Sequence, residues 1–100
     1  MAAGDVEILI GDGSRITQHE SVISSESGEE TLLVNQGTGS VHVINRTASE
    51  LWAMCAGGET VATLIGRFAG QYQVDPSVVR EDVYELLTTF ASLGVIDVEG

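Results

Sequence analysis

The chain has 100 residues, of which 15 are acidic and four basic, and its formal net charge is −11. A chain of this length forms one small domain, with a modest core and little room for a deep catalytic cleft. Nucleic acids and anionic membranes are bound through clustered Lys and Arg side chains, so this charge argues against both as partners.

The start of the chain and its cysteine content favour a cytoplasmic protein without disulfides. The opening Met-Ala-Ala-Gly-Asp lacks the basic and apolar regions of a secretory signal. No apolar run approaches the ~18 residues that a membrane span requires. Cys55 is the only cysteine, so no internal disulfide can form. Its neighbours Trp52 and Met54 predict a buried, unreactive thiol.

Weak strand patterns open the chain. Residues 6–10 form a short apolar run that predicts a strand, an arm or a segment exchanged with another subunit. Residues 17–24 predict a weak strand, whose apolar content is Val22 and Ile23. Residues 25–30 are polar and acidic, which predicts a loop.

A clearer hairpin pattern follows. Residues 31–35 predict a second strand, and residues 40–44 predict its antiparallel partner. The turn at residues 36–39 contains two glycines, which can adopt the positive φ that hairpin turns require. Residues 40–44 thus become the third strand of a predicted N-terminal sheet.

The first of three predicted helices follows that strand directly. Asn45 can cap it, and Thr47 with Glu50 offers an alternative capping box. Glycines at positions 57 and 58 end the helix. Its apolar residues recur at helical spacing and are Ala48, Leu51, Trp52 and Cys55.

Two further amphipathic helices have equally clear starts. The second begins at Thr60, and the third begins at Asp75 followed by Pro76, a capping carboxylate before a proline at the first helical position. Gly94 ends the third helix, and the next two residues fold back on its last turn. Their apolar stripes are Val61, Leu64, Ile65, Phe68 and Tyr72, and then Val79, Val83, Leu86, Leu87, Phe90 and Leu93. These elements predict an α+β fold, a small winged-helix-like domain with an N-terminal three-stranded antiparallel sheet followed by three helices.

No residue pattern predicts catalysis, a cofactor or a metal site. His19 and His42 lie far apart and outside any metal-ligand spacing. Glu81, Asp82 and Glu85 share one predicted helix, where a solvated acidic face explains them more simply than acid–base catalysis does. We therefore expect a protein that is not an enzyme.

The predicted third strand lacks the protection that sheet edges normally have. Proteins guard an exposed edge with lysine, proline or an inward charge, and residues 40–44 contain none of these. If this strand lies at the edge, it is open to pairing with an extended peptide. Because side chains alternate along a strand, either His42 and Ile44 or Val41 and Val43 face the helices, and we expect Ile44 on the core side.

An ordered series of short motifs runs from the second strand to the end of the third helix. The motifs are Leu32-Leu33-Val34 before the glycine turn, Val41-His42-Val43-Ile44-Asn45, Thr47-Ala48, Leu51-Trp52, Gly58-Glu59-Thr60-Val61, Glu81-Asp82-Val83, Leu86-Leu87, Phe90 and Gly94-Val95-Ile96. In order and spacing the series resembles the PqqD family, the small peptide chaperones of pyrroloquinoline quinone biosynthesis. The same domain is the recognition element for ribosomally made, post-translationally modified peptides. The chain departs from the family pattern at Gly57, Val41 and His42.

The resemblance implies a binding mechanism. The leader segment of a precursor peptide adds as an antiparallel strand to the third strand, and its side chains enter a groove beside the third helix. Asp82 would pair with a Lys, Arg or Tyr of the leader, whereas plain core packing is the alternative for the apolar residues of that helix. The expected peptide-binding residues are Ser40, Val41, His42, Val43 and Ile44 of the strand, and Val79, Asp82, Val83, Leu86 and Phe90 of the helix.

The hypothesis is a non-catalytic, cytoplasmic peptide chaperone without a cofactor or metal. It would present a leader peptide to a modifying enzyme, such as a radical S-adenosylmethionine enzyme or a leader peptidase. Residues 1–18 are expected to form an N-terminal arm or extra strand, and residues 19–100 the PqqD-like domain.

Two other functions fit a small winged-helix-like domain. A transcription regulator needs basic residues on its third helix, where only Arg80 is present. A structural or oligomerisation module would exchange residues 6–10 between chains and form a homodimer.

Overall fold

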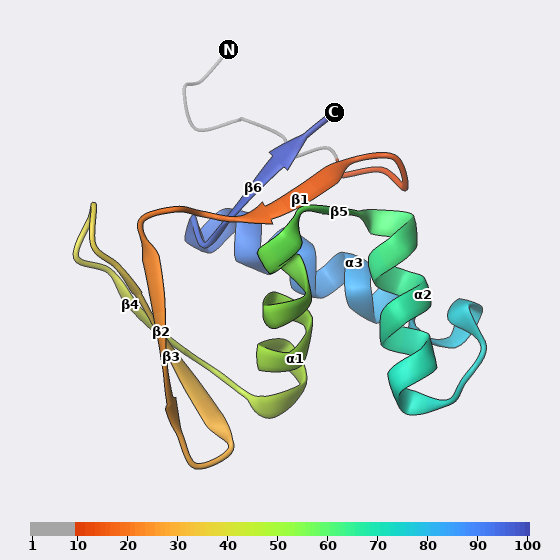
Figure 1. The fold of residues 1–100 in the computed structure, drawn as a ribbon, viewed down its shortest axis with the longest axis horizontal. Helices are drawn as coiled ribbons and strands as arrows, with labels where there is room; N and C mark the ends of the chain where they lie inside the picture. Colours follow the sequence, from red (N-terminus) through yellow and green to blue (C-terminus); the bar gives the residue numbers. More distant parts are fainter. Residues whose placement is uncertain (1–9) are drawn as a thin grey trace.

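Six short strands and three α-helices form residues 10–100, the part of the chain that the computed structural model describes (Figure 1). The strands make two separate three-stranded sheets, in the orders β2–β3–β4 and β5–β1–β6, and every pairing is antiparallel. In Figure 1 the β5–β1–β6 sheet lies across one end of the helices, and the β2–β3–β4 sheet stands beside α1. The predicted α+β fold, with an N-terminal three-stranded sheet before three helices, is confirmed.

The bounds of the elements are as follows. The first sheet contains β2 (Val22–Ser27), β3 (Glu30–Asn35) and β4 (Val41–Ile44), and the second contains β1 (Arg15–Gln18), β5 (Glu59–Thr60) and β6 (Ile96–Glu99). The helices are α1 (Arg46–Met54), which continues as a short 3-10 turn η1 (Cys55–Gly57), α2 (Val61–Tyr72) and α3 (Pro76–Leu93).

The prediction of one strand at residues 17–24 and a loop at 25–30 is wrong. The chain turns between β1 and β2, where the Val22 amide donates to the His19 carbonyl at 3.0 Å. β2 then runs through the polar residues to Ser27. These residues form a strand although they are polar, because they pair with β3 in a hairpin that projects into solvent and is exposed at its tip.

Each hairpin turn of the first sheet uses one glycine in a left-handed conformation. Gly28 has a φ of 65°, and with Glu29 it makes the two-residue turn between β2 and β3. In the next turn only Gly39, at a φ of 80°, takes the positive value that the sequence allowed for both glycines. The Asn35 side chain holds this turn by accepting from the amides of Gly37 and Thr38.

The second sheet was not predicted, and it joins the two ends of the described chain. β1 lies in its middle, with β5 on one side and β6 on the other, so residues 15–18 pair with residues 96–99. Ile16 of β1 is fully buried. Of the predicted residues 6–10, only Ile10 is described, and it packs against the core; the rest lie outside the described residues. The division of the chain at residue 18 stays a prediction.

All three predicted helix starts are confirmed by their capping contacts. The side chains of Asn45, Thr60 and Asp75 accept from amides in the first turns of α1, α2 and α3. The alternative box of Thr47 and Glu50 is not needed, and Glu50 contacts α2 instead. Gly94 ends α3 with a φ of 73°.

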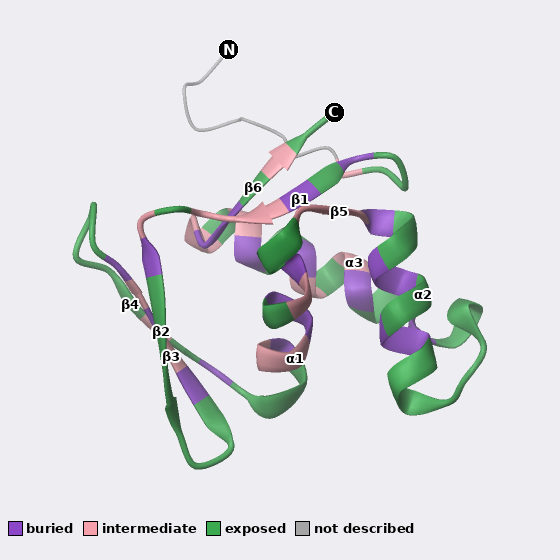
Figure 2. Ribbon diagram, viewed as in Figure 1, coloured by how far each residue is buried: buried purple, intermediate pink, exposed green. Residues whose placement is uncertain are grey.

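The core lies between the two sheets and the inner faces of the helices (Figure 2). The Trp52 indole nitrogen donates to the Val95 carbonyl at 3.1 Å, so α1 is tied to the end of α3. Cys55 is fully buried, and this burial raises the pKa of its thiol to about 12. None of the helices in residues 10–100 is long and apolar enough to cross a membrane.

Candidate functional site

β4 is an edge strand, because among residues 10–100 it pairs only with β3. The Asn35 amide donates to the Ser40 carbonyl at 2.9 Å, which fixes this pair as a hydrogen-bonded one. Hydrogen-bonded pairs alternate along an antiparallel ladder. The backbone N–H and C=O groups of Val41 and Val43 therefore point away from β3, toward the free edge.

Side chains on one face of β4 are buried or half-buried and those on the other face are exposed, and the buried face is the one that the sequence predicted. Ile44 faces the core and is 8% exposed, and His42 on the same face is half-buried. Val41 and Val43 lie on the opposite face, at 54% and 60% exposed. A peptide added to β4 would bond to the backbone of these two valines while their side chains stay on the outer face.

The predicted residues of α3 divide into core and surface residues. Val79, Val83 and Phe90 are at most 7% exposed, and their side chains pack in the hydrophobic core. Leu86 is half-buried and Asp82 is exposed, so these two side chains reach the surface. Whether any of the five contacts a peptide stays a prediction.

Asp82 and Leu86 share a cavity of about 320 Å³ that lies where β4 has passed into α1. Thr47, in the first turn of α1, forms one wall of this cavity, and Phe68 of α2 forms another. The complete lining is Thr47, Phe68, Asp82, Glu85, Leu86 and Thr89. The cavity therefore joins the end of the edge strand to α3.

Four of these lining residues were missed in the sequence. Glu85 and Thr89 lie three and seven residues after Asp82, a spacing that places them on one side of a helix and could have identified them. Thr47 and Phe68 come from other helices, so no local pattern connects them with α3. Only the packing of three helices brings them together.

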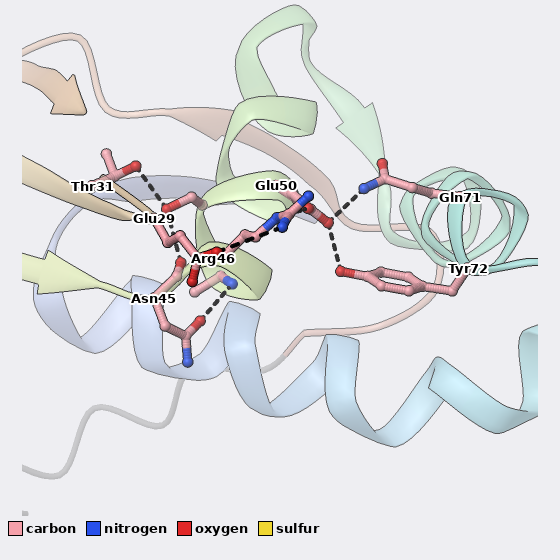
Figure 3. Close-up of polar contacts among 9 residues, drawn as sticks. Glu29, Thr31, Asn45, Arg46, Glu50, Gln71 and Tyr72 are labelled. Atoms are coloured by element: carbon pink, nitrogen blue, oxygen red, sulfur yellow. Dashed lines mark hydrogen bonds and ion pairs between the residues drawn. The ribbon is translucent and has the colours of Figure 1, made fainter. Parts of the chain in front are cut away.

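Glu50 connects α1 with the end of α2 through side-chain hydrogen bonds (Figure 3). Its carboxylate accepts from the amide of Gln71 and the hydroxyl of Tyr72, both at the end of α2, and from the Nε of Arg46 at 3.3 Å. The hydrogen bond to Glu50 is the main cause that raises the pKa of Tyr72. Figure 3 also shows Asn45 at the junction of β4 and α1.

The outer face of the first sheet carries a second surface, made of apolar side chains. One cross-strand row contains Ile23, Val34 and Val41, and the next contains Leu32 and Val43. Ile23 is 50% exposed, and nothing within residues 10–100 covers the row. This surface, which we call the outer apolar face, favours contact with another molecule.

The described part of the chain offers no metal centre. No group of three or more His, Cys, Asp or Glu side chains within residues 10–100 is placed to hold an ion. The strand edge offers backbone hydrogen-bonding groups, the cavity offers carboxylates beside apolar carbon, and the outer apolar face offers aliphatic side chains.

Two solved structures have a similar fold. TbiB1 in complex with the TbiA(beta) leader peptide matches with a TM-score of 0.70 at 20% identity, over 81% of this chain and 94% of that chain. Lasso peptide synthetase B1 complexed with the leader peptide matches with a TM-score of 0.68 at 16% identity, over 82% of this chain and 96% of that one. No curated protein sequence matches the chain significantly.

A family match covers the site itself. The sequence model of the family described as "Coenzyme PQQ synthesis protein D (PqqD)" matches residues 30–96. This range begins at the first residue of β3 and ends at the first residue of β6, and it includes β4, the three helices and every residue of the cavity. The chain therefore belongs to the PqqD family.

Proposed function

We propose that this protein is a non-catalytic chaperone that binds the leader of a ribosomally synthesised precursor peptide and presents it to a modifying enzyme. The observation that carries the proposal is the unguarded edge of β4, whose free side offers the backbone groups of Val41 and Val43. Membership of the PqqD family supports it, as do the two similar structures, since each is a complex with a leader peptide.

Strand addition explains how such an edge would bind. Two N–H and two C=O groups on the free side of β4 can form a ladder with an extended peptide. No lysine, proline or charged residue lies in β4 to prevent this pairing. The backbone ladder supplies affinity for many sequences, and side-chain contacts at the helices supply selectivity.

The direct test is an NMR titration. Peptides that bind the protein would first be selected from a displayed library of random peptides long enough to pair with all of β4. A selected peptide would then be added to the ¹⁵N-labelled protein. We expect the largest amide shifts in β4 and on α3. Shifts confined to the second sheet or to the α2–α3 turn would contradict strand addition, as would a library that yields no binder.

The outer apolar face gives the modifying enzyme a separate place to bind. Its side chains point away from the helices, so a peptide on the edge of β4 leaves this face accessible. The proposed occupant is the peptide-modifying enzyme, a radical S-adenosylmethionine enzyme or a leader peptidase, because presentation requires peptide and enzyme to be bound together. An apolar centre surrounded by an acidic chain suits a partner surface with basic residues at its rim.

Removing one apolar side chain tests this second contact. Ile23→Ser lies on β2, two strands away from the peptide edge, and should weaken binding to the enzyme while peptide affinity stays unchanged. Val78→Ser is the matched control, since Val78 is equally apolar and 63% exposed on α3. A dimer that Ile23→Ser dissociates would assign the face to a second copy of the chain and contradict the enzyme as its occupant.

A DNA-binding function gains no support from α3. Its only cationic residue, Arg80, forms an ion pair with Asp12 at 2.6 Å. The neighbouring side chains Glu81, Asp82 and Glu85 are exposed carboxylates, which repel phosphates. The helix that reads DNA in winged-helix regulators is therefore acidic in this protein.

A further inference from the structure

The cavity beside Thr47 combines an apolar interior with an acidic rim. Leu86 is half-buried and offers carbon surface to an occupant, while Phe68, which is 3% exposed, closes the cavity from the core side. Asp82 and Glu85 are exposed and line the same cavity. A long side chain with apolar methylene groups and a cationic end matches both features, because Lys and Arg bury their stems while the charge stays in water.

No cation of the described residues neutralises this rim. Each of the four arginines has a partner elsewhere: Arg15 donates to the Gly58 carbonyl, Arg46 contacts Glu29 and Glu50, Arg67 contacts Glu59, and Arg80 contacts Asp12. Asp82 and Glu85 form no ion pair or side-chain hydrogen bond within residues 10–100. Charge complementarity therefore favours a cationic occupant that another molecule supplies.

The position of the cavity indicates which part of a bound peptide would reach it. β4 runs toward Asn45, and the cavity begins at Thr47, just past the end of the strand. A peptide added antiparallel to β4 runs in the opposite direction. Its residues immediately before the paired segment would then lie over the cavity.

We propose that this cavity is a selectivity pocket for one Lys or Arg side chain of the leader peptide, located on the N-terminal side of the residues that pair with β4. The inference rests on the proposed function, and it adds a charge requirement that backbone pairing does not have. Asp82 and Glu85 bind the cationic end, and Leu86 contacts the methylene stem.

The test combines peptide selection with a double-mutant cycle. Peptides selected from the displayed random library on the wild-type protein should be enriched in Lys or Arg at one position before the paired segment. The Asp82→Asn/Glu85→Gln double variant should bind such a peptide about three- to tenfold more weakly. Replacing that Lys or Arg by Gln in the peptide should cause the same loss on wild type and no further loss on the double variant.

A matched variant separates this contact from the general effect of the negative charge. Glu81→Gln removes one carboxylate from the same helix, next to Asp82, but Glu81 does not line the cavity. We expect it to leave the affinity unchanged. Selected peptides without a basic position, or a cycle in which the two losses simply add, would overturn the pocket assignment. In that case peptides that still shift the amides of β4 would leave the proposed function intact.

Discussion

The Arg80 guanidinium forms two hydrogen bonds with the Asp12 carboxylate, at 2.6 and 3.0 Å, and so joins the loop before β1 to α3. The Tyr84 hydroxyl donates to the same carboxylate. These contacts hold the pKa of Asp12 below its usual value, with the hydrogen bond from Arg80 as the main cause. The same loop contacts the start of α2, where the Ala62 amide donates to the Asp12 carbonyl at 3.0 Å.

This arrangement predicts how stability depends on pH. Because folding lowers the pKa of Asp12, the carboxylate stabilises the fold above its ordinary pKa of 3.8, and this stabilisation is lost as the pH falls through the lower folded value. Asp12→Asn should therefore have a lower Tm than wild type at neutral pH. The difference should shrink toward zero in strong acid. A Tm difference that stays constant across an acid titration would contradict this assignment.

Proline at position 43 should weaken peptide binding selectively. The Val43 amide points to the free edge, so Val43→Pro removes a donor that a guest strand needs and that β3 does not use. We expect affinity for a selected peptide to fall about tenfold, measured by calorimetry.

The control for that experiment is Ser24→Pro on β2. The two-residue turn at Gly28 and Glu29 sets the register of β2 and β3. In this register the Ser24 amide points away from β3, toward the free edge of β2 on the other side of the sheet from β4. Ser24→Pro introduces the same proline ring into the same sheet and leaves β4 unchanged. Equal losses for both variants would mean that the peptide does not pair with the β4 edge.

Leu87 should be among the most costly positions to truncate. Its side chain is fully buried in α3. Leu87→Ala removes apolar contacts and leaves a cavity, so we expect the free energy of unfolding to fall by about 2–5 kcal/mol, measured by urea denaturation. Val78→Ala on the same helix, where the side chain is 63% exposed, should change it by less than about 0.5 kcal/mol.

Cys55 should resist alkylation in the folded protein. Burial raises the pKa of its thiol to about 12, so almost no thiolate exists near neutral pH. We expect mass spectrometry to find no iodoacetamide adduct on the native protein and complete modification in denaturant. Modification of the native protein at the rate of a free thiol would show that the first turn after α1 opens readily.

The parts of the fold that depend on local chemistry could be predicted from the sequence. Asn45, Thr60 and Asp75 cap the three helices because a side-chain oxygen reaches an amide two or three residues away, a contact that needs no distant partner. The position of Ile44 on the core side follows in the same way from the alternation of strand side chains.

The second sheet could not be predicted in this way. β5 has only two residues and β6 has four, and both pair with β1 from distant parts of the chain. Segments this short have no periodicity of their own, and tertiary pairing alone makes them strands. The same limit applies to the cavity, since Thr47 and Phe68 approach α3 only after the helices pack.

The pairing of β1 with β6 has a consequence for how the chain folds during synthesis. The Ser14 hydroxyl donates to the Gly100 carbonyl at 2.7 Å and residues 15–18 pair with residues 96–99, so this sheet closes only after residues 96–100 have been made. Synthesis runs from the N-terminus, so β1 is made well before the strand that completes its sheet. The hairpin of β2 and β3 involves only neighbouring residues, so it can form early, whereas β1 gains its β6 partner only after residues 96–99 have been made.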